Sequence, residues 1–300
     1  MKHWQYLPVQ GLLYIISLMP FWVLYGIADF IFVLVYYVVR YRRKIVAKNM
    51  RESFPELSDK ELKKIARKFY RNFADYIVET IKLNHISDEE IKRRMVFKNM
   101  DVIDRLFDEK QSITAYFSHC GNWEWVPSIT LWSRHTTGKD VEFCQVYRPL
   151  KNKWYDEYML RLRSRFNSLS FKKKTVLRDL LLLRRREMPS ITGFMSDQKP
   201  SKGDESHIVK FLNHPSAVIT GTEQVARKLD MAVVYFDMHK LSRGYYELEV
   251  KLITDNTSTM EPMAITDAYV KLLEETIKRN PSIWLWTHNR WKHKVKMPNE

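Results

Sequence analysis

A histidine and a glutamate stand five positions apart where an apolar β-type run gives way to a helical one. His119 closely follows residues 112–117, and Glu124 lies just past Asn122, a candidate N-cap of the next helix. Side chains five positions apart diverge on one continuous helix, but they can meet across a tight turn. A carboxylate bonded to one imidazole nitrogen fixes the tautomer and leaves the other nitrogen to act as a base. We therefore expect Glu124 to orient His119, which would take the proton of an alcohol as it attacks an acyl thioester.

The same residues have plainer interpretations. His119 can be a satisfied histidine in a strand–helix turn, and Glu124 an acidic residue favoured near a helix N-terminus. The adjacent Cys120 offers a different chemistry, in which a thiol attacks and carries the acyl group. Neighbours at the end of a strand point in different directions, which disfavours Cys120.

Further polar residues follow other strand candidates and are expected at the same edge. Arg148 and Asp197 each lie two positions after the end of such a run, and open α/β sheets bind ligands at the carboxyl ends of their strands. The Arg148 guanidinium could bind a phosphate or stabilise a developing oxyanion. Asp197 could orient Arg148 or bind groups of the acceptor. Gly121 and Asn122 can offer backbone N–H groups to an oxyanion at the helix start. The plainer readings are an exposed strand-end arginine and a turn aspartate.

Alternating strands and helices must position these residues. Strand character is found at residues 96–97, 102–107, 112–117, 141–146, 190–195, 231–238 and 245–253. Helices fit at residues 58–84, 123–134, 153–165, 175–186, 221–229 and 264–279. The sequence therefore predicts an α/β fold with a mixed, mostly parallel sheet flanked by helices.

The start of the chain has a different character. Residues 11–39 contain a single charged side chain, Asp29, and as one straight helix they would run about 43 Å. A bilayer core needs only about 20 apolar residues, so the segment must tilt or break near Pro20 or Gly26. We expect a membrane anchor over residues 1–44 and a catalytic domain over residues 45–300. A spanning helix, a re-entrant or surface-lying hairpin, and a buried soluble helix are the three alternatives.

Charge and composition limit the kinds of partner, cofactor and metal site that the protein can have. Lys and Arg total 50 against 35 Asp and Glu, a net charge of +15 that indicates a polyanionic partner. No glycine-rich nucleotide loop is present, and two cysteines cannot build a disulfide framework or a Cys-rich zinc site. The spacings of His207, His214, His239 and His288 match no ligand pattern, so we expect no metal and no cofactor. No nucleic-acid motif is present either, and the apolar start favours a lipid substrate.

Two clusters suit a charged or interfacial surface. Residues 161–186 hold ten basic side chains and one acidic one, which fits an anionic leaflet, an acidic carrier protein or lipid phosphates. A solvated helix face is the plainer reading. Near the end of the chain, Trp284, Trp286 and Trp291 fit a membrane interface or a packed core equally well.

Several motifs together resemble one family over nearly the full length of the chain. The chain is similar to the late acyltransferases of lipid A biosynthesis, of the lauroyl and myristoyl type. The pattern of His119 and Glu124 is shared with the wider glycerolipid acyltransferases, so it indicates acyl transfer and leaves the acceptor open. The matching features are the apolar start, Asn49 with Ser53-Phe54-Pro55, His119-Cys120-Gly121-Asn122-Trp123-Glu124, residues 146–152, Ser196-Asp197-Gln198, residues 211–215 and residues 281–292.

The resemblance implies an O-acyltransferase with a glycerolipid-acyltransferase-like core. Its donor would be an acyl carrier protein thioester, and its acceptor a hydroxyl on a 3-hydroxyacyl chain of a lipid A precursor. The enzyme would sit at the bacterial inner membrane, with the catalytic domain facing the cytoplasm. The basic residues after the apolar segment agree with that orientation, namely Arg40, Arg42, Arg43 and Lys44.

Two alternative functions remain open at this stage. One keeps the chemistry and changes the acceptor to an aminolipid or another glycolipid. The other is a membrane-surface scaffold that recruits an acidic protein through residues 161–186. Acyl chain length, acceptor position and oligomeric state are left open by the motifs.

Overall fold

A seven-stranded sheet forms the centre of the protein in the computed structural model, which describes residues 4–201, 206–292 and 295–297. Its strand order is β1-β9-β8-β2-β5-β3-β4, and β8 with β9 is its antiparallel pair. The remaining neighbours are parallel, which confirms the predicted mixed, mostly parallel sheet. Its strands are β1 (Met95–Lys98), β2 (Ile113–Phe117), β3 (Glu142–Tyr147), β4 (Leu169–Lys172), β5 (Ser190–Met195), β8 (Ala232–Ser242) and β9 (Tyr245–Thr254). A separate antiparallel pair consists of β6 (Ile208–Phe211) and β7 (His214–Ala217).

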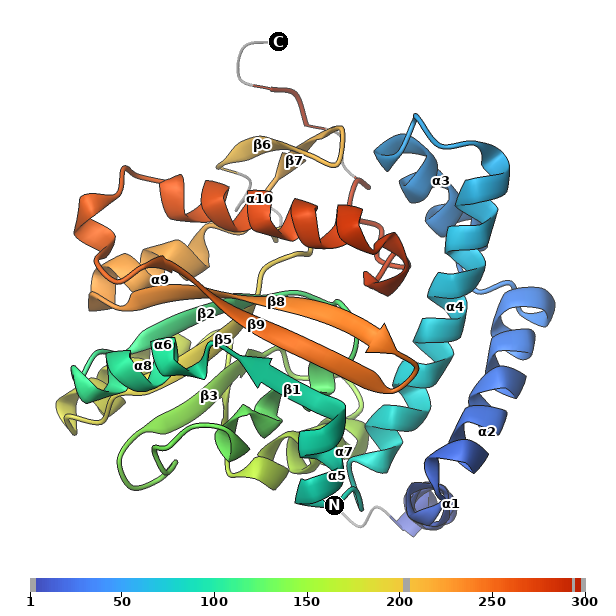
Figure 1. The fold of residues 1–300 in the computed structure, drawn as a ribbon, viewed down its shortest axis with the longest axis horizontal. Coiled ribbons are helices and arrows are strands. Elements are labelled where there is room, and N and C mark those ends of the chain that lie inside the picture. Colours follow the sequence, from blue (N-terminus) through green and yellow to red (C-terminus); the bar gives the residue numbers. More distant parts are fainter. Residues whose placement is uncertain (1–3, 202–205, 293–294, 298–300) are drawn as a thin grey trace.

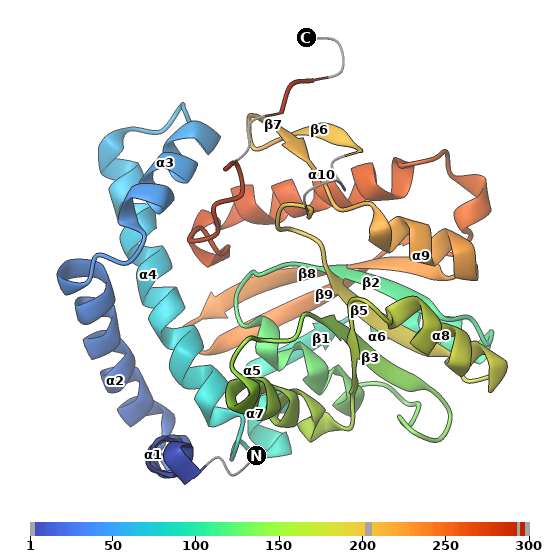
Figure 2. The ribbon, with the colours of Figure 1, turned by 180° about the vertical axis from the view of Figure 1, so that it is seen from behind.

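Helices cover both faces of this sheet and one end of it. Figures 1 and 2 show α10 on one side of β8 and β9, α5 and α7 on the other, and α4 standing between the sheet and α2. The α-helices are α1 (Leu7–Leu18), α2 (Phe21–Val33), α3 (Arg43–Ser53), α4 (Asp59–Lys82), α5 (Asp88–Arg94), α6 (Met100–Asp108), α7 (Lys153–Arg163), α8 (Val176–Arg185), α9 (Gly221–Leu229) and α10 (Ala264–Arg279). The shorter turns are η1 (Trp4–Tyr6), η2 (Leu34–Val38, a π-helical turn), η3 (Trp123–Leu131), η4 (Ser164–Phe166), η5 (Thr257–Thr259) and η6 (Pro281–Ile283).

The central strands are apolar because both their faces are covered. Every residue of β2 is buried, as are Ala232 to Met238 of β8. Parallel strands that lie between two helical layers show this continuous apolar pattern instead of alternation. At the start of α4, Ser58 and Glu61 form the capping box expected from their spacing.

Some elements differ from the sequence prediction for identifiable reasons. The helix expected at residues 123–134 is the 3-10 turn η3, which contains Pro127. Proline removes an N–H donor and clashes with the preceding turn, so a regular α-helix cannot continue through it. The strands β4, β6 and β7 are not predicted; each has four residues, too few for a clear alternating pattern. The strand character expected at residues 102–107 is wrong, because these residues belong to α6, where Ile103, Leu106 and Phe107 are buried at helical spacing.

The helix of the N-terminal apolar stretch is interrupted at Pro20, one of the two positions expected from the sequence. Helix α1 ends at Leu18, Met19 and Pro20 are extended, and Gly26 lies inside α2 without interrupting it. Within the described residues, the segment Phe21–Val38 is long and apolar enough to cross a membrane. It packs along α4, as both views show. The domain boundary proposed at residue 44 falls just inside α3 and stays a prediction.

Candidate active site

Two neighbouring parallel strands bring His119 and Asp197 together. Phe117, the last residue of β2, lies opposite Met195, the last residue of β5. His119 and Asp197 each follow two positions later, so both reach the carboxyl edge of the sheet at the same place. The His119 Nδ1 atom lies 2.8 Å from Asp197 Oδ1, and the His119 backbone N–H donates to Oδ2 over 3.2 Å.

Asp197 is buried and held from several sides. The indole N–H of Trp284 donates to its Oδ2 over 2.9 Å. Burial by itself would raise the pKa of Asp197, but the charge of His119 and the hydrogen bonds from His119 and Trp284 outweigh it, so the pKa lies below its ordinary value. An ionised Asp197 accepts the Nδ1 proton of His119, which leaves Nε2 as the basic nitrogen. Gln198 Nε2 lies 3.4 Å from that atom.

The C-terminal segment fixes the turn that carries His119. The Leu285 N–H donates to the His119 carbonyl, and the Gly121 N–H donates to the Ile283 carbonyl, each over 3.0 Å. These bonds flank Trp284, whose indole reaches Asp197. The three tryptophans near the end of the chain are buried, so they belong to a packed core in this structure.

Glu124 is not the carboxylate that orients His119. Both its oxygens accept from Arg163 of α7, from Nε over 2.8 Å and from Nη2 over 2.6 Å. The side chain of Glu124 is 4% exposed, so this two-pronged pair neutralises a buried charge. The pairing expected from the sequence is wrong: the imidazole is paired with Asp197, and Glu124 is paired with a guanidinium.

A cavity of about 700 Å³ opens beside His119. Glu124, Arg148 and Arg163 line it together with His119 and Gln198. This volume lies within the usual range of small-molecule sites. Much of its wall is apolar, formed by Phe117, Val126, Ile129, Phe143, Ile191, Phe194, Val225 and Phe236. Its basic lining residues include Lys173, Lys174, Lys199 and Lys228.

Arg148 lines this cavity as an exposed side chain, and Asp197 does not orient it. Among the described residues Arg148 has no hydrogen bond or ion pair with another side chain. Its guanidinium is therefore available to an anionic group that enters the cavity. Its predicted role in substrate binding stays a prediction.

Gly121 and Asn122 both make hydrogen bonds that hold the local structure together. Gly121 has a φ of +58°, and a Cβ there would lie 2.9 Å from Met238 Cγ, which explains why glycine occupies the turn. Its N–H already donates to Ile283. The Asn122 side chain does not cap η3 but donates to the buried Glu79 over 2.9 Å. That either backbone N–H serves an oxyanion stays a prediction.

Cys120 is fully buried, in an isolated bridge with Trp284. Burial raises the pKa of its thiol. A buried thiol with a raised pKa is a poor nucleophile, which agrees with disfavouring covalent catalysis by Cys120.

With the geometry in place, comparison with known proteins decides the family. Residues 1–293 match the sequence model of the bacterial lipid A biosynthesis acyltransferases. The chain belongs to this family. It is 23% identical over 283 residues to the lipid A biosynthesis lauroyltransferase of Escherichia coli (strain K12), which covers 94% of this chain and 89% of that protein. It is also 23% identical over 257 residues to the lipid A biosynthesis palmitoleoyltransferase of the same organism, which covers 84% of this chain and 79% of that protein.

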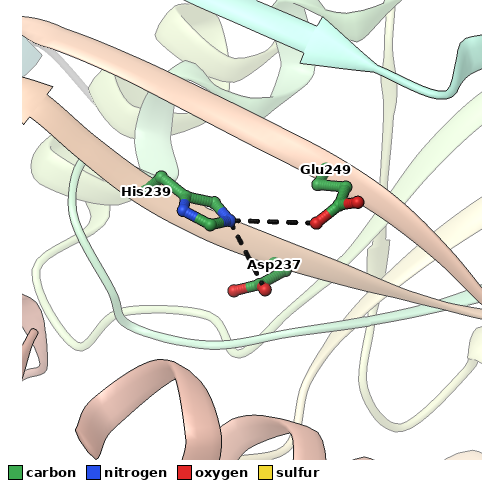
Figure 3. A group of neighbouring side chains, drawn as sticks. All are labelled: Asp237, His239 and Glu249. Atoms are coloured by element: carbon green, nitrogen blue, oxygen red, sulfur yellow. Dashed lines mark ion pairs between the residues drawn. The ribbon is translucent and has the colours of Figure 1, made fainter. Parts of the chain in front are cut away.

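A separate group of metal-ligand side chains lies on β8 and β9 of this acyltransferase. The His239 ring faces Asp237 and Glu249 (Figure 3). Its Nε2 lies 3.5 Å from Asp237 Oδ2 and 3.9 Å from Glu249 Oε2. Asp237 already accepts from Lys251 over 2.6 Å and from Arg279 over 2.5 Å. Two cations bound to one carboxylate repel a metal ion, so we interpret this group as an ion-pair network.

The sequence analysis does not identify two side-chain partners in this candidate site. Arg163 was counted only as one member of the basic cluster at residues 161–186. Trp284 was assigned to an interface or a core. Their roles depend on which element lies beside the His119 turn, and strand order and helix packing decide that. Arg163 lies near the end of the helix predicted at residues 153–165 and is the last residue of α7, and no local signal marks it as the partner of a buried acid.

Proposed function

We propose that the protein moves a fatty acyl chain from an acyl carrier protein thioester to a hydroxyl on a lipid A precursor. The acceptor hydroxyl would belong to a 3-hydroxyacyl chain already attached, so that the product carries a secondary acyl chain. The observation that supports this most directly is the His119–Asp197 pair beside a largely apolar cavity. An alcohol-activating base next to a hydrocarbon-lined space is what acyl transfer between lipids requires.

The proposed reaction is a direct transfer. Asp197 holds the Nδ1 proton of His119, and Nε2 takes the proton of the acceptor hydroxyl as its oxygen attacks the thioester carbonyl. The tetrahedral oxyanion collapses with cleavage of the C–S bond. The leaving thiolate takes the proton back from Nε2, which restores the neutral imidazole and releases the carrier thiol. General base catalysis of this kind contributes about 10²–10⁴-fold to the rate.

Two guanidinium groups have distinct proposed roles. Arg163 is fixed in the cavity wall by Glu124 and is suited to stabilising the oxyanion. Arg148 has no side-chain partner in the part of the chain that the structure describes, and it is suited to an anionic group of the donor or of the acceptor, such as a phosphate. Glu124 would therefore act through Arg163 and not through His119.

The proposed partners follow from the charge around the cavity. Lys173 and Lys174 are exposed and line it, a fit for an acidic carrier protein. The apolar segment followed by basic residues supports a bacterial inner membrane location with the catalytic domain in the cytoplasm, where a carrier protein thioester is available.

The test is transfer by the purified full chain from a radiolabelled acyl carrier protein thioester. We expect labelled lipid A precursor with one additional ester, and His119→Ala should remove the activity. His135→Ala is the matched control, because His135 does not line the cavity. Label that appears only on an aminolipid would replace the acceptor in this proposal. An unconsumed thioester, with carrier binding intact, would favour the scaffold function instead.

A further inference from the structure

One side of α2 is built into the catalytic domain. Its buried residues recur every four positions and continue into η2, so they form a single stripe that faces α4. Tyr36 packs on Tyr70 of α4 with ring centroids 5.2 Å apart, and the Arg71 guanidinium lies 5.1 Å from the Phe32 ring. Figures 1 and 2 show α2 beside α4 over much of its length. The stripe consists of Leu24, Ala28, Phe32 and Tyr36.

An ion-pair network of Asp29, Asp75 and Arg243 holds the middle of this helix against the domain. Arg243, in the turn between β8 and β9, donates to Asp29 over 2.9 and 3.1 Å and to Asp75 over 2.7 and 2.9 Å. It also donates to the Tyr25 carbonyl over 3.2 Å, while the Tyr25 hydroxyl donates to the buried Glu79. The single charge of the apolar segment is therefore bound to the domain.

This ion-pair network is incompatible with a helix α2 that crosses the bilayer. Asp29 lies midway along Phe21–Val38, so a crossing helix would place it at the bilayer centre. Arg243 and α4, which carries charged side chains along its length, would have to accompany it into the hydrocarbon. A charged side chain is costly at that depth, and the backbone groups of the turn between β8 and β9 would lie in hydrocarbon without water to bond them.

The opposite side of α2 is apolar and uncovered. Trp22 is 78% exposed and Phe30 is 69% exposed. Exposed apolar surfaces of this kind mark an interaction partner. The set continues with Val33, Leu34, Tyr37, Val38 and Val39, and on α1 with Leu7, Leu12, Tyr14, Ile15 and Leu18.

The chemistry around this surface favours a lipid leaflet as that partner. Exposed Arg40, Arg42 and Lys44 follow directly, and aromatic side chains with polar edges lie among the aliphatic ones. Basic and aromatic residues that border an apolar helix face are typical of helices lying in an anionic interface. The surface also meets the active-site region, because Tyr6 stacks on Trp154 at 4.8 Å and Asn152 donates to the Tyr6 hydroxyl.

We propose that α1, α2 and η2 lie in the plane of one anionic leaflet, docked on α4 through Asp29 and Arg243, and do not cross the membrane. In this arrangement the apolar side enters the boundary between headgroups and acyl chains. The nearby Leu150 is 40% exposed and lines the cavity, so a lipid acceptor reaches the site along the leaflet. The proposal concerns how the enzyme sits on the membrane and does not depend on which acceptor it uses.

Depth measurements along α2 distinguish the two arrangements. Fluorescent labels are attached to Trp22→Cys, Phe30→Cys and Val38→Cys in the full chain, reconstituted in vesicles that contain phosphatidylglycerol and lipids brominated at defined depths. The native Cys120 and Cys144 are buried and do not compete for the label. A label at Leu252→Cys is the matched control, because Leu252 is also exposed and lies about 23 Å along β9 from the start of the strand, next to Arg243.

In-plane docking predicts similar, shallow depths at all three positions, about 5–10 Å below the headgroups, and no quenching at Leu252. A crossing helix predicts that the label at position 30 lies about 12 Å deeper than those at 22 and 38, since eight residues of helix separate them. That profile would overturn the proposal. Labels that no lipid quencher reaches would also overturn it and would indicate that a second copy of the chain covers this side; the activity of each labelled variant, measured in parallel, tests the acyl-transfer function separately.

Discussion

The residue that the site depends on most, beside His119 itself, is Asp197. Its carboxylate is buried, yet the charge of His119 and its hydrogen-bond donors hold its pKa below the ordinary value. An acid with a depressed pKa in the folded state stabilises the fold above its unfolded pKa, and this stability is lost as the pH falls through the folded value. Asp197 therefore links the geometry of the proposed catalytic pair to the stability of the protein.

This linkage predicts how Asp197→Asn changes acid stability. The free energy of unfolding of the wild-type protein should decrease from about pH 5 downward as Asp197 becomes protonated. Asp197→Asn should be less stable at pH 7 and show a shallower decrease, so that the two curves converge at low pH. Urea unfolding between pH 7 and pH 3 measures this, and parallel curves would contradict it.

Glu124 leads to a different prediction, because its partner is Arg163. Glu124→Ala leaves a largely buried guanidinium without its carboxylate, and we expect a loss of about 3 kcal/mol in the free energy of unfolding. The double variant Glu124→Ala with Arg163→Ala should regain part of the loss. Equal stability of Glu124→Ala and wild type would contradict the pairing.

At the residue scale, the sequence predicted the members of the site better than their pairing. His119 and Asp197 both follow strand candidates, so their common edge was predictable. Their contact was not, because it requires β2 to lie beside β5, a strand that begins more than 70 residues later. Glu124 was assigned to the nearer histidine since nothing local shows that α7 brings Arg163 to it.

Among the elements, β5 shapes the cavity through a missing side chain. A Cβ at Gly193 would lie 3.0 Å from the Phe117 ring, and both residues line the cavity. Gly193→Ala should push this ring into the space beside the site and shift transfer toward shorter acyl chains. Mass spectrometry of products from a mixture of donor chain lengths measures the shift.

Gly221 provides the matched control for this substitution. It also lines the cavity, but a Cβ there would meet no atom within 4 Å. Gly221→Ala should leave the chain-length distribution unchanged. If the two variants gave the same distribution, the Phe117 contact would not limit the acyl chain.

The turn between β8 and β9 packs closely against α2 at another glycine, Gly244. Gly244 has a φ of +73°, and a Cβ there would collide with the Tyr25 hydroxyl and approach Arg94 to 2.9 Å. Gly244→Ala should therefore loosen α2 in addition to the cost of about 1–2 kcal/mol for a left-handed alanine. Gly138→Ala carries the same backbone strain, at a φ of +78° with open space around it. Proteolysis near residues 40–42 should accelerate in Gly244→Ala only; equal rates in both variants would argue against this docking.

At the element scale, length and regularity decided what was predictable. The five longer strands, as apolar or alternating runs, and the longer helices, by their hydrophobic periodicity, are predicted close to their observed bounds, except that β8 ends four residues later than predicted. Short edge strands such as β4 and the proline-containing turn η3 carry little periodic signal. The order of strands in the sheet depends on tertiary packing, which a single sequence does not display.

The whole molecule carries a net charge of +15, which should govern its encounter with an acidic donor. We expect kcat/KM for an acyl carrier protein thioester to fall steeply as salt is raised, and a small neutral pantetheine thioester to show little dependence. Lys173→Glu with Lys174→Glu should weaken the carrier-dependent reaction about tenfold or more at low salt. Lys139→Glu is the control because Lys139 is exposed and does not line the cavity. Salt dependence that is the same for both donors would exclude electrostatic docking of the carrier.

The central claim, that Asp197 orients His119 as the base, is tested most directly by the rate of the chemical step in two matched variants. Single-turnover acyl transfer is measured at one fixed pH for the wild type, Asp197→Asn and Glu124→Gln. The account predicts that Asp197→Asn lowers the rate about 10²–10⁴-fold, because an uncharged amide no longer fixes the imidazole tautomer in which Nε2 is the base. Glu124→Gln should lower the rate less, because Glu124 contacts Arg163 and not His119. A rate close to that of the wild type in Asp197→Asn, together with a larger loss in Glu124→Gln, would contradict the account.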